Sequence, residues 1–279
     1  MWYSERLPAL AWFRPGRAGG LSACAFNGSG FNARQPNAPS FHEKLFIEHH
    51  PARAGSLAAM TTLLLATRNR HKTGEIQAIL GPSLRCLTLD DYPGAPPVVE
   101  DADSFAGNAA KKAGELARWL VDEKRGARNA ECGINFVLAD DSGLEVDALG
   151  GAPGVHSARF AVLDTGAAGN STDAANNTKL LRLLETVPLE KRTARFRCVL
   201  ALVRIDPTGV IGAPQFFDGA CAGRIQFTPG GQGGFGYDPL FVPDGFEKSF
   251  AELGEDVKNK LSHRAQALGK LRAWFQRAG

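Results

Sequence analysis

Apolar and polar positions follow alternating strand-like and helix-like patterns from position 60 onward. The short apolar runs Thr62–Ala66 and Leu84–Thr88 predict two buried strands. Between them, apolar residues on one face predict a short helix over Thr73–Leu80. Ser104 is the predicted N-cap of a longer helix that extends to about Val121, because apolar residues follow it at intervals of three and four.

The second half of the chain contains longer segments of the same two kinds. Ile134–Ala139 predicts a strand, and Asp173–Thr186 predicts a helix that begins after a Ser-Thr capping signal. Arg195–Ile205 alternates apolar and polar positions, and Gln215–Gln226 predicts its hairpin partner. Ser262–Gln276 carries the apolar stripe of a final helix. Strands that alternate with helices early and pair locally later predict an α/β domain around a mixed sheet.

The first 59 residues do not share this pattern. They are rich in Gly, Pro, Asn, Ala and Arg and show no sustained period, which predicts a disordered or loosely attached extension before a domain at 60–279. There are three explanations for this extension. The sequence begins at an upstream start codon while Met60 is the effective first residue, or the extension is a plain tail, or it is an organelle-targeting leader. A clean amphipathic helix, as a targeting leader would have, is missing.

Charge and cysteine usage exclude several classes of function. The extension holds six basic and three acidic residues and accounts for the net charge of +3, so positions 60–279 carry 26 of each and are neutral. A neutral body gives no support for broad nucleic-acid binding. No run approaches the roughly 18 apolar residues of a membrane helix. The five cysteines are scattered without a CxxC pair, which argues against a disulfide framework or zinc site and favours a cytoplasmic location.

Two adjacent carboxylates, Asp140 and Asp141, directly follow the strand that is predicted to end at Ala139. Adjacent carboxylates at a strand end resist burial unless a cation compensates them, and Mg²⁺ does this well. One carboxylate could bind the metal while the other orients or deprotonates a water molecule. The alternative is a tight turn, since Asp-Ser-Gly is also good turn chemistry. Glu100 is a possible additional metal ligand, although acidic loops are usually only solvated.

A polar segment stands where the first strand ends and the first helix begins. Free backbone N–H groups and the positive end of the helix dipole meet there and favour an anion. Basic and amide side chains in the same segment add a cradle for a polyphosphate. A polar helix-capping turn is the alternative interpretation. The candidate residues are Thr67, Arg68, Asn69, Arg70, His71 and Lys72.

The segment from Gly231 to Gly236 formally matches the GxGxxG dinucleotide fingerprint. That motif should open a helix, whereas here Pro239 begins an extended run, so the dinucleotide interpretation fails. We expect instead that the loop lets backbone approach a flat ligand, with Phe235 or Tyr237 stacked on a base. A surface loop with a buried aromatic anchor is the alternative.

Basic side chains also occur near the start of the final helix. If Ser262 is the N-cap, His263 and Arg264 fall in the first turn, where cations oppose the helix dipole at a cost of about 0.3–1 kcal/mol each. Their placement makes sense if an anion or an electron-rich base edge docks there, together with Lys258. The alternative is a solvated first turn.

From about position 61 to 273 the chain resembles the Ham1/RdgB-type inosine triphosphate pyrophosphatases. The resemblance rests on the order, spacing and length of five motifs. These are Thr67-x-Asn69-x-x-Lys72, Ala139-Asp140-Asp141-Ser142-Gly143-Leu144, Gly150-Gly151-Ala152-Pro153-Gly154-Val155-His156-Ser157-Ala158-Arg159, Gly233-Gly234-Phe235-Gly236-Tyr237-Asp238-Pro239 and Ser262-His263-Arg264.

The resemblance implies cleavage of ITP, dITP and XTP between the α and β phosphates, giving a monophosphate and pyrophosphate with Mg²⁺ as cofactor. Asp141 matches the family's proton acceptor and metal contact, and Thr67 through Lys72 match its phosphate-binding turn. The implied fold is an elongated, two-lobed α/β structure around a long mixed β-sheet flanked by helices, with the active-site cleft between the lobes, in a homodimer. The positions that match nucleotide-binding residues are Ser142, Phe235, Gly236, Tyr237, Asp238, Lys258, His263 and Arg264.

One stretch departs from the family pattern Glu-x-Gly-x-Thr-Phe-x-Glu-Asn-Ala. Glu100 is present as an expected metal ligand, but Gly107 replaces the second Glu, so any role of that carboxylate is lost. The expected mechanism is in-line attack by water, with Lys72 and Arg70 on the β and γ phosphates and His263 or Arg264 reading a 6-keto group. A pyrophosphatase for other altered nucleotides and a non-catalytic nucleotide sensor are the alternatives.

Overall fold

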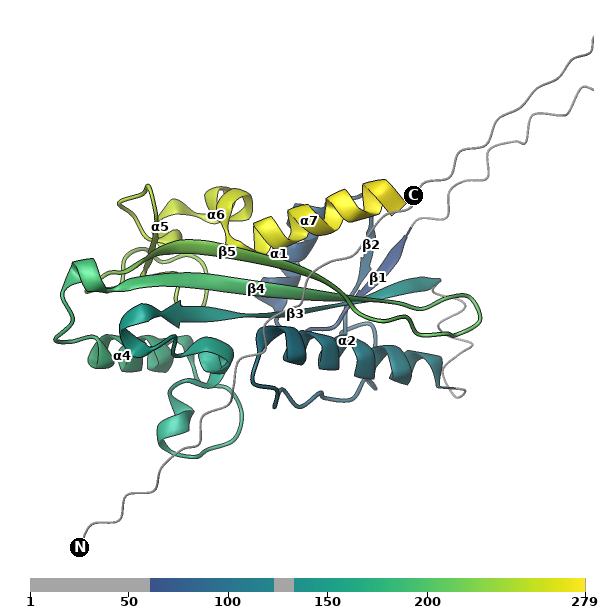
Figure 1. The fold of residues 1–279 in the computed structure, drawn as a ribbon, viewed down its shortest axis with the longest axis horizontal. Coiled ribbons are helices and arrows are strands. Elements are labelled where there is room, and N and C mark those ends of the chain that lie inside the picture. The colour runs from purple at the N-terminus through teal and green to yellow at the C-terminus, as the bar shows by residue number, and fades with distance from the viewer. Residues whose placement is uncertain (1–60, 123–132, 279) are drawn as a thin grey trace, which may run out of the picture. The chain divides into compact units, whose positions relative to one another are not determined.

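The computed structural model describes residues 61–122 and 133–278 (Figure 1). The predicted extension at 1–59 and its boundary lie outside the described residues. So does all but the last residue of 125–133, which the sequence predicts to be a polar loop. The strands are β1 Thr62–Leu65, β2 Arg85–Leu87, β3 Ile134–Val146, β4 Thr193–Arg204, β5 Gln215–Ile225 and β6 Phe241–Pro243. The α-helices are α1 Arg70–Leu80, α2 Phe105–Val121, α4 Asp173–Leu183, α5 Phe250–Leu253, α6 Glu255–Leu261 and α7 His263–Ala278.

These strands form one six-stranded sheet in the order β2-β1-β3-β4-β5-β6. The first strand, β1, pairs in parallel with β2 and β3, whereas β4, β5 and β6 are joined by antiparallel pairing. The sheet is therefore mixed, and the predicted α/β class is confirmed. A local hairpin joins β4 to β5, which follow each other in the chain, whereas β3 and β4 pair antiparallel across the intervening helix α4.

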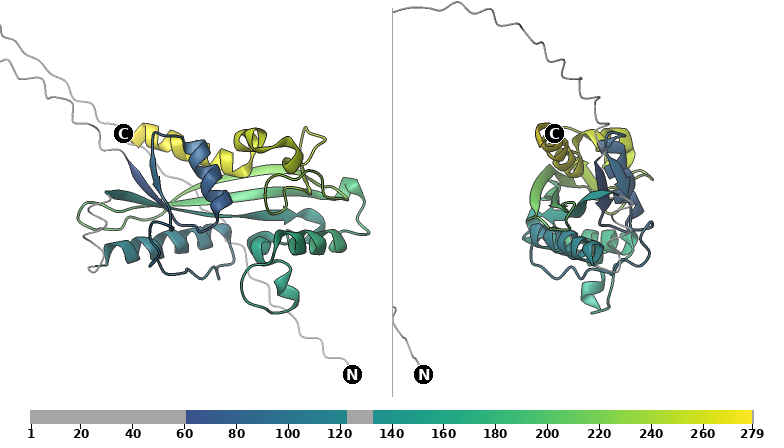
Figure 2. Two further views of the ribbon diagram at one scale, coloured as in Figure 1. Left: turned by 180° about the vertical axis from the view of Figure 1, so that it is seen from behind. Right: turned by 90° about the vertical axis from the view of Figure 1, so that its right-hand side faces the viewer.

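Helices cover both faces of the sheet. Figures 1 and 2 show α2 and α4 on one side and α1, α5, α6 and α7 on the other. Because successive residues of a strand point to opposite faces, Val137 packs in the cluster under α2 and Leu138 in the cluster under α1 and α7. A further cluster joins α4, the end of β3, the start of β4, the end of β5, and Tyr237 in the segment 231–238, which we call the Gly-rich loop.

Side-chain caps define where the helices begin. Asn69 accepts from a backbone N–H of α1, so this helix begins at Arg70 rather than at the predicted Thr73. Ser104 caps α2 and Thr172 caps α4, as the sequence predicts. The Ser262 hydroxyl accepts from a backbone N–H of α7, so the predicted start of the final helix is also confirmed.

The predicted end of a strand at Ala139 is wrong, and so is the alternative of a tight turn after it. Strand β3 continues through Asp140 and Asp141 to Val146. It does so because β4 pairs with every residue from Phe136 to Val146, and this long-range ladder outweighs the local turn preference. The two carboxylates therefore point to opposite faces of the sheet.

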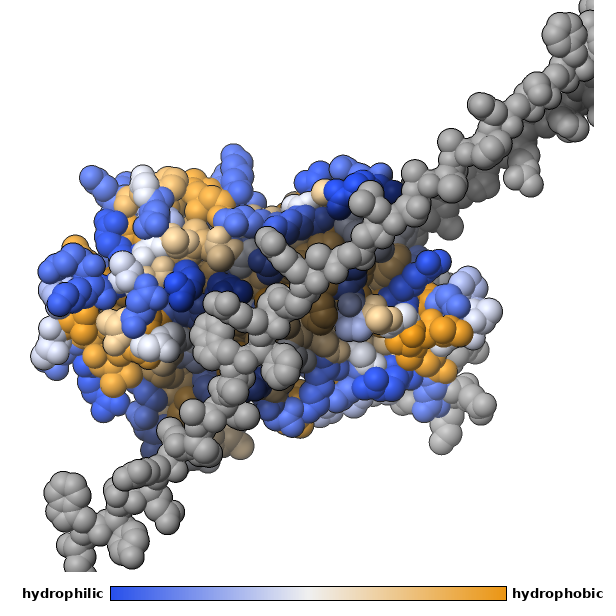
Figure 3. Space-filling view, in the orientation of Figure 1, coloured by the Kyte–Doolittle hydropathy of each residue, from blue (hydrophilic) through white to orange (hydrophobic). Residues whose placement is uncertain are grey.

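On the face that Figure 3 shows, hydrophilic residues alternate with groups of hydrophobic ones. Val210 lies in the connection between β4 and β5, and Phe216 lies near the start of β5; both are exposed. Among residues 61–122 and 133–278, no helix is both long and apolar enough to cross a membrane.

One glycine sets how closely α7 approaches the sheet. A Cβ on Gly219 in β5 would lie 2.8 Å from the backbone nitrogen of Ala267 and also against the carbonyl oxygen of His263. Gly219→Ala should therefore destabilise the protein by about 1–3 kcal/mol or more, because backbone atoms cannot move aside like a side chain.

A matched control lies on the same helix. Gly269 is exposed and has open space around an added Cβ, so Gly269→Ala should stabilise by about 0.5–1 kcal/mol. Urea unfolding of the two variants measures both effects. Changes of equal sign and size would contradict the close approach of α7 to β5.

Candidate active site

Asp140 lies on the α1 and α7 side of β3, where four side chains surround its carboxylate. Its Oδ1 accepts from the Lys72 ammonium at 2.6 Å and the Ser142 hydroxyl at 2.9 Å. Its Oδ2 accepts from Arg264 Nε at 2.9 Å and the Cys198 thiol at 3.3 Å. Burial alone would raise the pKa of Asp140, but Arg264 and Lys72 together hold it well below the usual range.

A chain of buried ion pairs extends from Asp140 toward the Gly-rich loop. Arg264 also pairs with Glu75 on α1, and Glu75 Oε1 accepts from Lys258 Nζ at 2.7 Å. Lys258 in turn lies 2.5 Å from Asp238 Oδ2, and the same oxygen accepts from the backbone N–H of Phe235. With Lys72, three cations and three carboxylates alternate, so the network is neutral. The predicted nucleotide-binding cations Lys72, Lys258 and Arg264 thus already have carboxylate partners.

Asp141 lies on the opposite face, against α2. Its Oδ1 is 3.3 Å from the Lys112 ammonium and its Oδ2 accepts from Asn108 Nδ2 at 3.1 Å. The same ammonium is 3.4 Å from Glu100 Oε1 and donates to the backbone carbonyl of Asp140 at 2.7 Å. We call these three oxygen donors, from Glu100, Asp141 and the Asp140 carbonyl, the oxygen cage.

The two adjacent carboxylates have opposite electrostatics. Burial raises the pKa of Asp141, and Glu100 raises it further, although Lys112, Lys72 and Asn108 oppose the shift. A carboxylate with a raised pKa is a stronger base than an ordinary aspartate. Asp141 is therefore suited to accept a proton, whereas Asp140 is held in its charged form by its partners.

Phe235 and Tyr237, the two predicted stacking residues, lie in different environments. Tyr237 is buried and its hydroxyl donates to the carbonyl oxygen of Ser157 at 2.9 Å, so it anchors the loop inside the protein. Phe235 is partly exposed, with the His71 ring stacked at 5.2 Å and the Lys258 ammonium 4.3 Å from the ring centroid. Only Phe235 is placed to meet a ligand from solvent.

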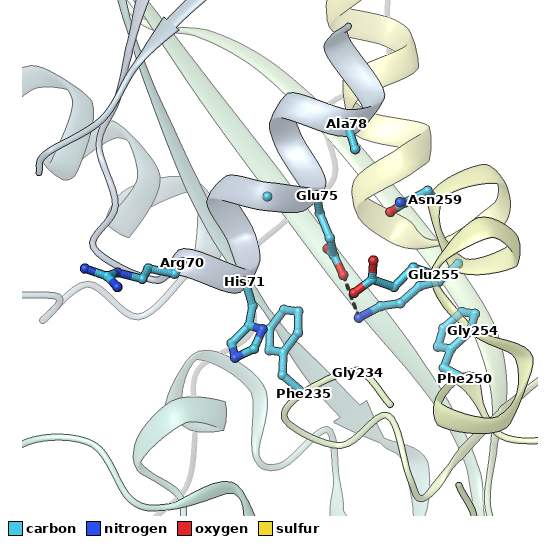
Figure 4. Close-up of a pocket in the computed structure, with 12 residues that line it drawn as sticks. Arg70, His71, Glu75, Ala78, Gly234, Phe235, Phe250, Gly254, Glu255 and Asn259 are labelled. Atoms are coloured by element: carbon cyan, nitrogen blue, oxygen red, sulfur yellow. Dashed lines mark ion pairs between the residues drawn. The ribbon is translucent and has the colours of Figure 1, made fainter. Parts of the chain in front are cut away.

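A pocket of about 240 Å³ lies beside this ring, between α1, α6 and the Gly-rich loop (Figure 4). In Figure 4, His71 of α1 lies beside the Phe235 ring, and Glu75 of the same helix points into the pocket. Gly236 in this loop has φ of 62° and donates its N–H to Asp173 at 2.6 Å, which ties the loop to the start of α4. A left-handed backbone of this kind favours glycine.

His263 is buried in the first turn of α7, with its ring stacked on Phe196 at 4.8 Å. Burial and the cations Arg264 and Lys258 lower its pKa far below the usual value, so the imidazole is neutral. Its Nδ1 has no hydrogen-bond partner among the described residues. Buried polar atoms are usually hydrogen-bonded, so this unpaired nitrogen marks His263 as a candidate ligand-binding residue.

The predicted phosphate turn is only partly brought together with the carboxylates. Lys72 reaches Asp140, but the Arg70 side chain is 88% exposed and lies 3.5 Å from Asp90. Arg68 donates to the carbonyl oxygen of Ala95 at 2.8 Å, and the Thr67 hydroxyl accepts from the Asn69 N–H at 3.1 Å. Of this turn, only the start of α1 and Lys72 therefore lie beside Asp140, whereas Arg68 and Arg70 bond to other parts of the protein.

Sequence reasoning missed Lys112, Asn108 and Glu75. Lys112 and Asn108 are one helical turn apart on α2 and are buried beside its apolar stripe. Polar residues within the buried face of an amphipathic helix are the signal that could have identified them. Glu75 is the equivalent on α1, next to the buried Ile76.

The structure also explains why Gly107 stands where the family pattern has Glu. A Cβ at position 107 would lie 2.8 Å from the Cβ of Ala102, which itself stands where the pattern has Gly. The two departures are therefore coupled: the methyl group of Ala102 fills the space that a side chain at 107 would use.

The oxygen cage consists only of oxygen donors. The described part of the chain has no cluster of three or more His, Cys, Asp or Glu side chains suited to a metal. Glu100 and Asp141 supply two carboxylates beside a backbone carbonyl, and hard divalent cations prefer oxygen donors of this kind. These residues fit Mg²⁺ by donor type, whereas the predicted ligand carboxylate of Asp140 lies on the other face of the sheet and only its backbone carbonyl belongs to the cage.

Comparisons with known proteins agree with the motifs. The model of the Ham1 family matches residues 63–274. The dITP/XTP pyrophosphatase of Opitutus terrae is 44% identical over 227 residues, which cover 77% of this chain and 99% of that protein. The dITP/XTP pyrophosphatase of Shouchella clausii is 44% identical over 213 residues, 76% of this chain and 96% of the relative. The solved structure of a HAM1 protein from Coxiella burnetii is 34% identical, with a TM-score of 0.63 over 78% of this chain and 100% of that one.

Asp140→Asn tests the buried ion network. Removing one charge leaves Arg264 and Lys72 undercompensated, so we expect a loss of about 3–5 kcal/mol in unfolding free energy at neutral pH. Because the folded pKa is depressed, this stabilisation is present above the unfolded value of about 3.9 and disappears as the pH falls toward the folded pKa. The difference between wild type and variant should therefore shrink below about pH 4.

Asp218→Asn is the matched control, since Asp218 pairs at 3.1 Å with Lys270 on the surface. It should cost less than about 1 kcal/mol. Urea unfolding across pH measures both variants. A small, pH-independent effect of Asp140→Asn would contradict the network.

Proposed function

The chain belongs to the Ham1 family, and on that premise we propose that it hydrolyses non-standard purine nucleoside triphosphates. The substrates are ITP, dITP and XTP, and the products are the nucleoside monophosphate and pyrophosphate. The names of relatives that are 44% identical support this substrate class. The single structural observation that carries the proposal is Asp141, a buried carboxylate that Asn108 holds beside Glu100 and Lys112.

In the proposed reaction, water attacks the α-phosphorus in line with the bond to the bridging oxygen of the β-phosphate. The new P–O bond forms as the bridging bond breaks, and pyrophosphate leaves with that electron pair. Asp141 takes the proton from the water, and Asn108 fixes its carboxylate through Oδ2. Mg²⁺ held by Glu100 and Asp141 would offset phosphate charge near the reacting bond.

The start of α1 is the proposed site for the phosphates. Its free N–H groups favour an anion, and Lys72, which donates to Asp140, has two further N–H groups for a phosphate oxygen. The Arg70 side chain pairs with Asp90 only on the surface, where such a pair is worth about 0–1 kcal/mol, so it can turn toward the β and γ phosphates at low cost.

The proposed base site lies between Phe235 and the start of α7. Arg264 bonds through Nε and both Nη atoms to Asp140, Glu75 and Ser142, so it positions the site rather than reading the base. His263 has the unpartnered Nδ1 and is the better candidate to donate to a 6-keto oxygen. The 6-amino group of adenine cannot accept that bond.

The proposal further includes Mg²⁺ as the cofactor, a homodimeric assembly and a cytoplasmic location. The oxygen-only donor set of the cage supports the choice of Mg²⁺. The family resemblance supports the dimer, and the scattered cysteines support a reducing compartment. Cys86, Cys198 and Cys221 are free thiols among the described residues.

The first test is pyrophosphate release from ITP, XTP, dITP, ATP and GTP, with and without Mg²⁺. We expect metal-dependent release from the first three and a loss of about 10²–10⁴-fold in Asp141→Asn, because the variant lacks the base. Asp101→Asn is the control, since Asp101 is exposed and pairs with Lys111 outside the cage. Comparable turnover of ATP and ITP would contradict the proposed selectivity for non-standard purines. Binding of ITP without release of pyrophosphate would favour a non-catalytic nucleotide sensor.

Phe235→Leu tests the proposed base stacking. Losing the aromatic face should raise KM for ITP about 10- to 100-fold, because stacking of a base on an aromatic ring is worth about 1–3 kcal/mol. Phe227→Leu is the control, since Phe227 is exposed and packs over Arg192. Steady-state kinetics decide the question: an unchanged KM in Phe235→Leu would rule out stacking on this ring.

A further inference from the structure

The Lys112 ammonium sits among the same oxygen atoms that fit a metal ion. We propose that Lys112 is an internal counter-ion that occupies the oxygen cage in the metal-free enzyme and leaves it when a divalent cation binds. This inference rests on the proposed function, because it assigns the metal of that reaction to Glu100 and Asp141.

The geometry of the ammonium supports this assignment. Lys112 Nζ lies 2.7 Å from the Asp140 carbonyl oxygen, 3.3 Å from Asp141 Oδ1 and 3.4 Å from Glu100 Oε1. Its side chain is only 10% exposed, so these oxygens, rather than water, supply most of its solvation. A cation bound by three protein oxygens from three residues occupies the space that a metal ion would use.

Charge balance makes the two cations mutually exclusive in the cage. Two carboxylates and one ammonium leave a single negative charge, and Lys72 on the other face is already bound to Asp140. Adding a divalent ion without moving Lys112 would place three positive charges against two negative ones in a partly buried site. Like charges a few ångströms apart repel strongly where water is scarce, so the ammonium must move out.

Displacement has a consequence for the substrate. Lys112 has a flexible stem, and its displaced ammonium would stay near the cage, where the proposed α-phosphate reacts. A triphosphate would give the displaced ammonium a new anionic partner, so metal and nucleotide should each favour binding of the other. Lys112 is thus a positioning residue that couples the two ligands.

The test is a calorimetric titration of the full chain with Mg²⁺, and separately with Mn²⁺, in the absence of nucleotide. Lys112→Met keeps the length of the side chain and removes its charge, so the metal no longer competes with an ammonium. We expect metal affinity at least about tenfold tighter than that of the wild type. Lys112→Arg, which keeps the charge, should retain the weak affinity of the wild type.

Lys111→Met is the matched control on the same helix. Lys111 pairs with Asp101 at 2.5 Å, so its loss should leave metal affinity unchanged. Thermal unfolding adds a second readout. Without Lys112 the two carboxylates repel each other, so Mg²⁺ should raise the Tm of Lys112→Met more than that of the wild type.

Unchanged or weaker metal affinity in Lys112→Met would overturn the inference. A fall in Tm that Mg²⁺ does not restore would also overturn it, because Lys112 would then only support the fold. These measurements contain no nucleotide, so failure of the proposed hydrolysis shows up separately in the pyrophosphate assay. Tight metal binding by Lys112→Met together with no release from ITP would contradict the reaction alone.

Discussion

Two adjacent carboxylates in the middle of a buried strand are the constraint on which the rest of the site depends. Each buried charge costs several kcal/mol unless a partner compensates it, and a strand turns Asp140 and Asp141 to opposite faces. One cationic cluster therefore cannot serve both. Lys72 from α1 and Arg264 from α7 compensate Asp140 on one face, and Lys112 from α2 compensates Asp141 on the other.

The cations on the two faces compensate the two carboxylates to different degrees. This difference gives one carboxylate a structural role and leaves the other suited to proton transfer. Asp140 receives Arg264 and Lys72 at hydrogen-bond distance, so its pKa falls and it remains charged. Asp141 shares Lys112 with Glu100, so burial dominates and its pKa rises. Asp140 is thus suited to a structural role and Asp141 to the role of the proposed base, although the two residues are identical and adjacent in the chain.

The neutral ion network also links the two ends of the proposed substrate. It begins at Asp140, beside the helix start proposed for the phosphates, and ends at Asp238, which holds the backbone of Phe235. Because Glu75 lies between Arg264 and Lys258, a change at either end alters the partners of the other. Such a network favours one arrangement of α1, α7 and the Gly-rich loop.

Local patterns in the sequence by themselves determined the helices α1, α2, α4 and α7, most strands and the helix caps at Ser104, Thr172 and Ser262, because periodicity and capping act over a few residues. The short helices α5 and α6 were not predicted. Local patterns also identified the segments of the site other than α2, whose Asn108 and Lys112 contact Asp141. Tertiary structure alone decided that β3 continues past Ala139, because only pairing with β4 outweighs the turn preference of Asp-Ser-Gly. That continuation determined which face each aspartate occupies, and long-range packing then buried Tyr237 and brought Lys112 to Glu100. Contacts between residues far apart in the chain leave no local period, so only the folded chain shows them.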